Sequence, residues 1–431
     1  MKKIFKFAMM FAMTSTLALG FTACGSDDDD DNGPVQPTDE AKYKDKSYGQ
    51  AAIDACAEVT KQFTAANEAI GTARLTTEQE QYLREVLASL VSNVIVPTYT
   101  DLANDVEDLE NTLKGLNTQT ITQAQIDKAC TDFKKARQHW ERSEAFLMGA
   151  ASDFGVDPTI DSWPLDRTEL LNYFKGGMTA EIDDESSILG FHALEFILFR
   201  NGQNRKVSEL QQNDTYTNFT SVSGADELKY AQQVCKLLKE RCFQLLVAWE
   251  GEKNQNQSRA DVVKAAGLEY TTEKGLSYGE NLKFAGDLDK STFTSVQAAV
   301  EQVLSATEGS CVGIANEVGT AKIANPFSSG DIAYVESPYS YNSITDFQDN
   351  IRACRNVWFG SIDGSAASVS FHSFFAGISN GSNTNNAVEN AFQSAIDKIG
   401  AMPAPFVKYC SVVWGKDFDD PENWESTTEE E

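Results

Sequence analysis

The sequence predicts an all-α protein built from two helical-bundle domains, and three observations support that class. Apolar residues recur at intervals of three and four residues through several long stretches, which is the pattern of a helix with one buried face. Capping-box sequences open several of these stretches, and glycines close them. The sequence contains no sustained alternation of apolar and polar residues of the kind that a half-buried strand needs. Such helices bury their apolar faces against one another, so we expect antiparallel bundles.

Residues 1–23 have the features of a secretory signal peptide. Two lysines precede an apolar stretch over residues 4–21, and small residues separate that stretch from Cys24. Small residues before a cysteine resemble the cleavage site of bacterial lipoproteins, in which the acylated cysteine becomes the N-terminus. We therefore predict lipidation at Cys24, attachment to a membrane through the lipid, and an outer-membrane lipoprotein exposed at the cell surface. An ordinary signal peptide and a membrane-spanning helix are the alternatives.

Residues 24–45 are expected to form an acidic tether between the lipid and the folded part of the chain. Five consecutive aspartates, Asp27 to Asp31, repel one another and bury no apolar surface, so this run does not fold on its own. The run also resembles the acidic export signal of bacterial surface lipoproteins. A second acidic stretch, residues 426–431, is expected to form a tail.

Composition excludes several classes of function. The chain has 36 basic and 64 acidic residues and a net charge of -28, so it would repel a phosphate backbone and no nucleic-acid partner is expected. The three histidines, His139, His192 and His372, are too few for a site built from several imidazoles. The seven cysteines after Cys24 include no CxxC pair, so the sequence carries no signal for zinc, iron–sulfur or covalent haem binding.

The long helices expected from the apolar spacing begin after residue 46. They span residues 77–115, with a kink at Pro97, and residues 122–149, 228–249, 295–318, 346–359 and 385–399. A polar stretch near residues 201–224 separates two halves, so we place an N-terminal bundle at residues 46–210 and a C-terminal bundle at residues 211–425. Similar residues recur in segments 131–149 and 345–360, which favours an ancient duplication; chance similarity between amphipathic helices is the alternative.

One predicted helix, within residues 184–200, is apolar nearly all the way round and still carries two titratable residues. His192 and Glu195 lie one turn apart on the same face. An unpaired carboxylate in such a helix is very costly, so Glu195 must be paired, protonated or coordinated. Gly190 is unfavourable inside a helix and indicates close approach of another segment. The pair is either a metal or ligand site or a buried pair that fixes helix packing, and residue type alone favours packing.

The stretch GFHALEFILF at residues 190–199 contains the pattern GxHxxE and resembles the signature of the imelysin family, which includes lipoproteins of the iron-regulated protein A type. Four further segments resemble that family in the expected order. They are ARQHWERSEAFLMG at residues 136–149, IDSWPLD at 160–166, ESPYSYNS at 336–343 and NVWFG at 356–360. The similarity therefore extends over most of the chain after the predicted signal peptide.

The resemblance implies an all-helical, two-domain fold with a shared polar pocket that faces His192. The family usually has an acid where this chain has Tyr341 and a histidine where it has Ile344, so two potential ligands are missing and metal binding is expected to be weak. A metal would be held by His192 and Glu195. The residues that match the family's pocket are Glu144, Asp161, Trp163, Asp166, His192, Glu195, Glu336, Ser340, Asn342 and Asp346.

The family has been linked both to peptidase activity and to iron or haem acquisition. We predict a protein that binds iron, haem, a divalent metal or another small nutrient, and that works with outer-membrane uptake proteins. A metal-dependent peptidase is the alternative, although the sequence lacks HExxH and a nucleophile elbow. A structural or adhesive surface protein is the second alternative.

Overall fold

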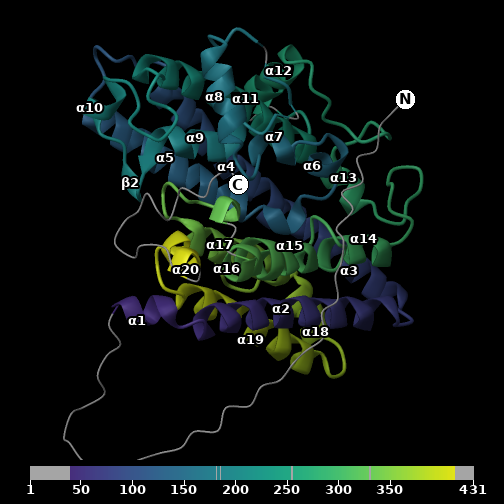
Figure 1. Ribbon diagram of the computed structural model, residues 1–431. Helices are drawn as coiled ribbons and strands as arrows, with labels where there is room; N and C mark the ends of the chain where they lie inside the picture. The colour runs from purple at the N-terminus through teal and green to yellow at the C-terminus, as the bar shows by residue number, and fades with distance from the viewer. Residues whose placement is uncertain (1–38, 181, 185, 254–255, 330–331, 413–431) are drawn as a thin grey trace, which may run out of the picture. The chain divides into compact units, whose positions relative to one another are not determined.

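The computed structural model describes residues 39–412 except 181, 185, 254–255 and 330–331, and its regular structure is almost entirely helical (Figure 1). The predicted all-α class is confirmed. Within the described residues the β-structure that forms a sheet is one short hairpin, in which β1 (Phe199–Arg200) pairs antiparallel with β2 (Gln203–Asn204). The predicted signal peptide, Cys24, most of the tether and the acidic tail lie outside the described residues.

One group of helices packs around the segment that carries His192. It contains α4 (Val96–Leu113), α5 (Gln123–Glu141), α9 (Gly190–Leu198) and α11 (Gly224–Glu250). Helix α11 begins where the Ser223 side chain accepts a hydrogen bond from the Asp226 N–H at 3.2 Å. Shorter helices accompany this group: α6 (Ala150–Asp153), α7 (Asp157–Ile160), α8 (Arg167–Lys175), α10 (Val207–Leu210), α12 (Gln257–Ala265) and α13 (Tyr278–Lys283).

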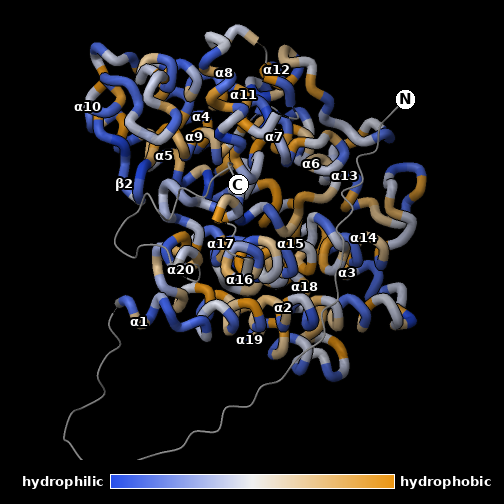
Figure 2. Tube along the Cα trace, in the orientation of Figure 1, coloured by the Kyte–Doolittle hydropathy of each residue, from blue (hydrophilic) through white to orange (hydrophobic). Residues whose placement is uncertain are grey.

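A second group packs around the long helix α2 (Ser47–Gly71). Helices α14 (Val296–Leu304), α15 (Cys311–Glu317) and α19 (Gly381–Gly400) contact α2, and α17 (Ser343–Phe359) packs on α15 and α19. Figure 2 shows hydrophobic and hydrophilic residues interleaved along α2, as the helical spacing requires. The remaining helices are α1 (Asp39–Lys44), α3 (Thr77–Leu90), α16 (Asn325–Ser329), α18 (Phe371–Ala376) and α20 (Phe406–Val412).

The two groups do not follow chain order. Helix α2, from the N-terminal half, packs with helices of the C-terminal half, whereas α11 packs with α4 and α9. The division into bundles at residues 46–210 and 211–425, and the duplication, stay predictions. The end of the predicted tether needs a correction, because residues 39–44 form α1 and α1 packs on α20.

Two of the expected helices are less regular than predicted: one contains a π-helical stretch and the other is interrupted. The helix expected over residues 77–115 is continuous but contains a π-helical stretch, η1 (Val91–Ile95), just before Pro97. Its capping box is formed by Thr76 and Gln79, directly before and within α3. The helix expected over residues 295–318 is interrupted after Leu304, because Ser310 caps a new helix through a hydrogen bond from the Gly313 N–H at 3.0 Å.

The other helix ends follow local chemistry. Helix α5 stops at Glu141 rather than at residue 149, and a 3-10 turn, η2 (Glu144–Phe146), follows it. Segments 228–249, 346–359 and 385–399 all lie inside observed helices. One helical run among the described residues, Thr77–Leu113, is long and apolar enough to cross a membrane, and more than half of its most apolar window is buried, as in the core helix of a globular domain.

Candidate functional site

The start of α9 is fixed by a close backbone contact. Gly190 is the first residue of the helix and has φ +74°, and a Cβ atom there would lie 2.0 Å from the carbonyl oxygen of Ile160. The close approach expected at Gly190 is therefore present, but at the helix start rather than in its interior. Because Asp161 follows Ile160 directly, this contact brings Asp161 next to the first turn of α9.

His192 faces three carboxylates. Its Nε2 atom lies 3.0 Å from Asp161 Oδ1 and 3.7 Å from Glu336 Oε1, and its Nδ1 atom lies 3.8 Å from Glu195 Oε2. The side chain is only 4% exposed. Burial opposes the charged imidazolium, but the neighbouring charge of Asp161 outweighs it and raises the pKa of His192 to about 9. The ring is therefore protonated at neutral pH.

Glu195 is held by the loop before α17. Its Oε1 atom accepts hydrogen bonds from the backbone N–H groups of Tyr339 at 3.2 Å and Ser340 at 2.7 Å, and from the Ser340 hydroxyl at 2.6 Å. Hence one oxygen of the buried carboxylate is fully hydrogen-bonded, and the other lies 3.8 Å from the His192 ring. The predicted neighbours Glu195 and Ser340 do meet, although they are 145 residues apart in the chain.

Arg137 and Lys322 provide permanent positive charges at the site, and neither is among the site residues predicted from the sequence. Arg137 pairs with Asp161, with Glu141 at 2.6 Å and with Glu336 at 2.5 Å. Lys322 Nζ lies 3.2 Å from Glu144 Oε2 and 3.3 Å from Glu336 Oε1. Glu336 therefore links both cations to the segment that precedes Ser340.

The carboxylates of this site experience different environments. Burial raises the pKa of Glu141 to about 7 against the opposing charge of Arg137, and burial also raises the pKa of Glu144 well above its usual range. Burial likewise raises the pKa of Asp346. Although burial opposes ionisation of Asp161 as well, the charge of Arg137 holds the pKa of Asp161 well below its usual range.

We call the following set the carboxylate cluster. Its six acids are Glu141, Glu144, Asp161, Glu195, Glu336 and Asp346, and its cations are Arg137, Lys322 and protonated His192. With all nine groups ionised the charge is -6 + 3 = -3. Buried charges need compensation, so the cluster must take up protons or a further cation. Burial raises the pKa values of Glu144 and Asp346, so proton uptake by these two acids is one way to compensate the charge.

Two groups of three donors in the cluster have the spacing of a metal site. The ligand atoms of Asp161, His192 and Glu336 lie within 4.8 Å of one another, and so do those of Glu141, Glu144 and Asp161. The sequence-based expectation paired His192 with Glu195 as metal ligands. Glu195 belongs to neither group: its Oε2 atom lies on the Nδ1 side of His192, whereas Asp161 and Glu336 lie on the Nε2 side.

The other predicted site residues have separate roles. Asp346 accepts hydrogen bonds from the Ser337 hydroxyl and from the Asn342 amide, both at 2.6 Å. Trp163 is half-buried and packs edge-to-face on Tyr334 with ring centroids 5.4 Å apart. Asp166 stays a predicted site residue, and in the structure its side chain caps α8 by accepting from the Glu169 N–H at 2.8 Å.

At the two positions where the sequence departs from the family pattern, the side chains pack against other residues. Tyr341 has φ +59°, and its ring lies against Gly202, where an added Cβ would be 2.3 Å from Cδ2. Ile344 is partly buried against the core. The other two histidines lie in separate ion pairs, His139 with Asp105 at 3.3 Å and His372 with Glu389 at 3.2 Å.

Some of the site residues that were not predicted could have been recognised from the sequence, and others could not. Arg137 falls on the apolar stripe of α5 with Trp140, and a charge on a buried stripe indicates a buried partner. Glu141 follows one turn later, at the i,i+4 position. Lys322 gave no signal, because it lies beyond the expected helix end in a π-helical stretch, η4 (Val318–Ala324). Asn350 donates to Glu141 Oε2 at 2.6 Å. A single asparagine within the regular helical spacing of α17 does not stand out in the sequence.

A second buried group of charges serves as a reference. Arg205 binds Glu227 through two hydrogen bonds of 2.8 and 3.2 Å, and Arg200 pairs with Asp214 at 2.8 Å. We call these four residues the Arg205 cluster. It contains two cations and two anions, so its formal charge is zero.

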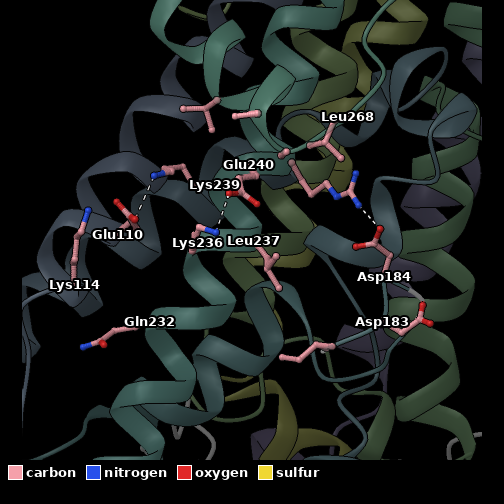
Figure 3. A pocket seen from close by; sticks show the side chains of 15 residues that line it. Glu110, Lys114, Asp183, Asp184, Gln232, Lys236, Leu237, Lys239, Glu240 and Leu268 are labelled. Carbon is pink, nitrogen blue, oxygen red and sulfur yellow. Dashed lines mark hydrogen bonds and ion pairs between the residues drawn. The ribbon is translucent and has the colours of Figure 1, made fainter. Parts of the chain in front are cut away.

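A large cavity lies away from both clusters. It has a volume of about 1190 Å³ and is lined by residues of α4, α11, α12 and the segment 182–184 (Figure 3). Its rim carries ion pairs, including Lys239–Glu110 at 3.2 Å and Lys236–Glu240 at 3.3 Å. None of the ten predicted site residues lines it. The polar pocket expected around His192 is therefore a buried cluster and not part of this cavity.

Comparison with known proteins gives consistent results. A family model described as Imelysin, which is classed as a peptidase family, matches residues 95–424. Iron-regulated protein A of Synechococcus elongatus is 27% identical over 314 residues, which cover 72% of this chain and 72% of that protein. A crystal structure from Parabacteroides distasonis, described as an iron-regulated protein A precursor, matches in fold with a TM-score of 0.59 at 24% identity, over 79% of this chain and 96% of that one.

Proposed function

Because this chain belongs to the imelysin family, we propose that it has an iron-related role at the cell envelope, as a lipid-anchored protein that binds a cation in the carboxylate cluster. The similarity to iron-regulated protein A supports the iron-related part. The charge imbalance of the cluster carries the cation-binding part, since six buried acids face three cations. Anchoring through Cys24 and cooperation with outer-membrane uptake proteins belong to the same proposal.

The donor set suits iron as cargo. Carboxylate oxygens and imidazole are ligands that iron accepts, and Asp161, His192 and Glu336 offer two of the first kind and one of the second. Asp161 is further oriented by the Trp140 indole, which donates to its Oδ2 atom at 2.7 Å. Iron binding needs His192 as the neutral ring, so binding should strengthen as pH rises.

A metal-dependent peptidase is the second candidate, and one observation favours it. Glu141 has a pKa raised by burial to about 7, which suits a general base. However, its carboxylate is fully buried and already binds Arg137 at 2.6 Å and Asn350 at 2.6 Å. Peptide hydrolysis would require these contacts to open, so binding is the function that the geometry favours. An adhesive role would follow if neither binding nor cleavage is found.

The proposal is tested by equilibrium dialysis of the full chain against Fe²⁺ under anaerobic conditions, followed by metal analysis. Asp161→Asn should weaken binding at least about tenfold, because it removes a ligand shared by both donor groups. Asp214→Asn is the matched control, since it neutralises a buried aspartate in the Arg205 cluster and should leave binding unchanged.

Two results would count against binding as the function. Absence of Fe²⁺ binding by the wild-type chain would refute it, as would equal affinity of the wild type and Asp161→Asn. Chelator-sensitive cleavage of an unfolded protein substrate, abolished in Glu141→Gln, would replace it with the peptidase reading.

A further inference from the structure

We infer that Lys322 is an internal cation that occupies the place of a divalent cation among Glu141, Glu144 and Glu336, and that it thereby limits the affinity of the cluster for divalent cations. The inference deepens the proposed function by naming the residue that sets cation affinity.

The Lys322 ammonium has the surroundings of a bound ion. The residue is 2% exposed, and its Nζ atom lies 3.2 and 3.4 Å from the two oxygens of Glu144, 3.3 Å from Glu336 and 3.8 Å from Glu141. A divalent cation binds carboxylate oxygens at about 2.0–2.6 Å. To bind such an ion in place of the ammonium, Glu144 and Glu336 would need to move inward by about 1 Å and Glu141 by about 1.5 Å.

The same place contains oxygen atoms that the ammonium does not use. Glu336 Oε2 and Asn350 Oδ1 are both buried, and neither has a hydrogen-bond partner among the described residues. The Asn350 side chain is held beside the acids, because its amide nitrogen donates to Glu141 at 2.6 Å and to Glu144 at 3.2 Å. Buried acceptors without donors are unfavourable in a purely structural ion-pair network, and carboxylate and amide oxygens are ligands for hard cations.

Lys322 reaches the acids from a separate element. It lies on the π-helical stretch η4, whereas Glu141 and Glu144 lie at the end of α5 and in η2, and Glu336 lies in the segment before α17. Short π-helical stretches are rare and are frequently found at functional sites. The lysine can therefore leave without removing any of the three carboxylates, which other elements hold.

The test uses Lys322→Met in the full chain, with Mn²⁺ as the probe cation. Methionine keeps an unbranched side chain of similar length but no charge. We expect Mn²⁺ to bind at least about tenfold more tightly than to the wild type, a difference of about 1.4 kcal/mol. Adding Glu144→Gln to this variant should abolish the gain. Lys239→Met is the matched control, because it removes an ammonium paired with Glu110 outside the cluster.

The outcomes separate this inference from the proposed function. If the wild type binds Mn²⁺ and Fe²⁺ and Lys322→Met binds Mn²⁺ no more tightly, the role of Lys322 is refuted and cation binding stands. If only Lys322→Met binds, the wild-type function is refuted and the role of Lys322 is supported. Should the methionine variant not fold, Lys322→Gln keeps a donor for Glu144, and its Mn²⁺-induced rise in melting temperature must exceed that of the wild type.

Discussion

The carboxylate cluster and the Arg205 cluster bury charges equally well but balance them differently. In the Arg205 cluster two arginines meet two acids that are 14 and 22 residues away in the chain, and each charge has an opposite partner. In the carboxylate cluster six acids share three cations, and Arg137 reaches Glu336 across 199 residues. Burial of charge alone is therefore no functional signal, because both clusters show it. The imbalance distinguishes a site that can accept a ligand from one that only holds segments together.

The largest expected effect comes from removing Arg137. Arg137→Met leaves Asp161, Glu141 and Glu336 without their main cation, and breaking a buried pair costs about 3–5 kcal/mol. The free energy of unfolding from urea titration would measure it. Adding Asp161→Met should not restore stability, because two of the three acids remain.

The balanced cluster should respond differently to the same treatment. Arg205→Met alone should cost a similar amount, but adding Glu227→Met should restore most of the stability, since Arg200 and Asp214 still pair with each other. Urea unfolding of the single and double variants gives the comparison. If the second substitution restored stability equally in both clusters, the two clusters would not differ in charge balance.

The next effect concerns pH and His192. The folded-state pKa of about 9 lies above the usual value of 6.5, so the protonated ring stabilises the fold fully below pH 6.5 and this contribution is lost as pH rises through 9. The contribution is about 3 kcal/mol. The difference in unfolding free energy between wild type and His192→Gln should therefore shrink between pH 6.5 and 10. A constant difference would show that His192 is not charged in the folded protein.

Neutralising an acid should change the stability of the protein in opposite directions in the two clusters. Burial outweighs the charge of Lys322 and raises the pKa of Glu144 well above its usual range, so an ionised Glu144 is costly in the fold and Glu144→Gln should raise the stability of the protein. Burial also raises the pKa of Glu227, to about 7, but Glu227 accepts both hydrogen bonds from Arg205, so Glu227→Gln should destabilise the protein. Thermal unfolding at pH 7 measures both, and a loss of stability in Glu144→Gln would contradict the imbalance.

The smallest effect tests the capping role of Asp166. Asp166→Ala removes the cap of α8 and should cost about 1 kcal/mol, with no change in Fe²⁺ or Mn²⁺ binding. Melting temperature and dialysis on the same sample measure both quantities. Weaker cation binding in this variant would show that Asp166 belongs to the site.

The sequence predicted the parts of the site that depend on local chemistry. The apolar surroundings of Glu195 required a partner, and Gly190 required a close neighbour, and both are present. Those partners lie on segments far along the chain, so local sequence patterns could not identify them. Only the family resemblance placed Glu195 and Ser340 in one site. Lys322 could not be found in this way, since a π-helical stretch changes which residues share a face and the spacing rule for α-helices no longer applies.

The long separation between Glu195 and its donors also constrains the order in which the protein acquires its structure. Ribosomes add about 5–20 residues per second, so the 145 residues between Glu195 and Ser340 take roughly 7–30 s to make. During that time α9 has been synthesised while its carboxylate lacks the two backbone donors and the hydroxyl that bind it in the finished protein. Burying α9 before that loop has docked would leave the acid without its donors, so we expect stable packing of α9 to need the loop that precedes α17.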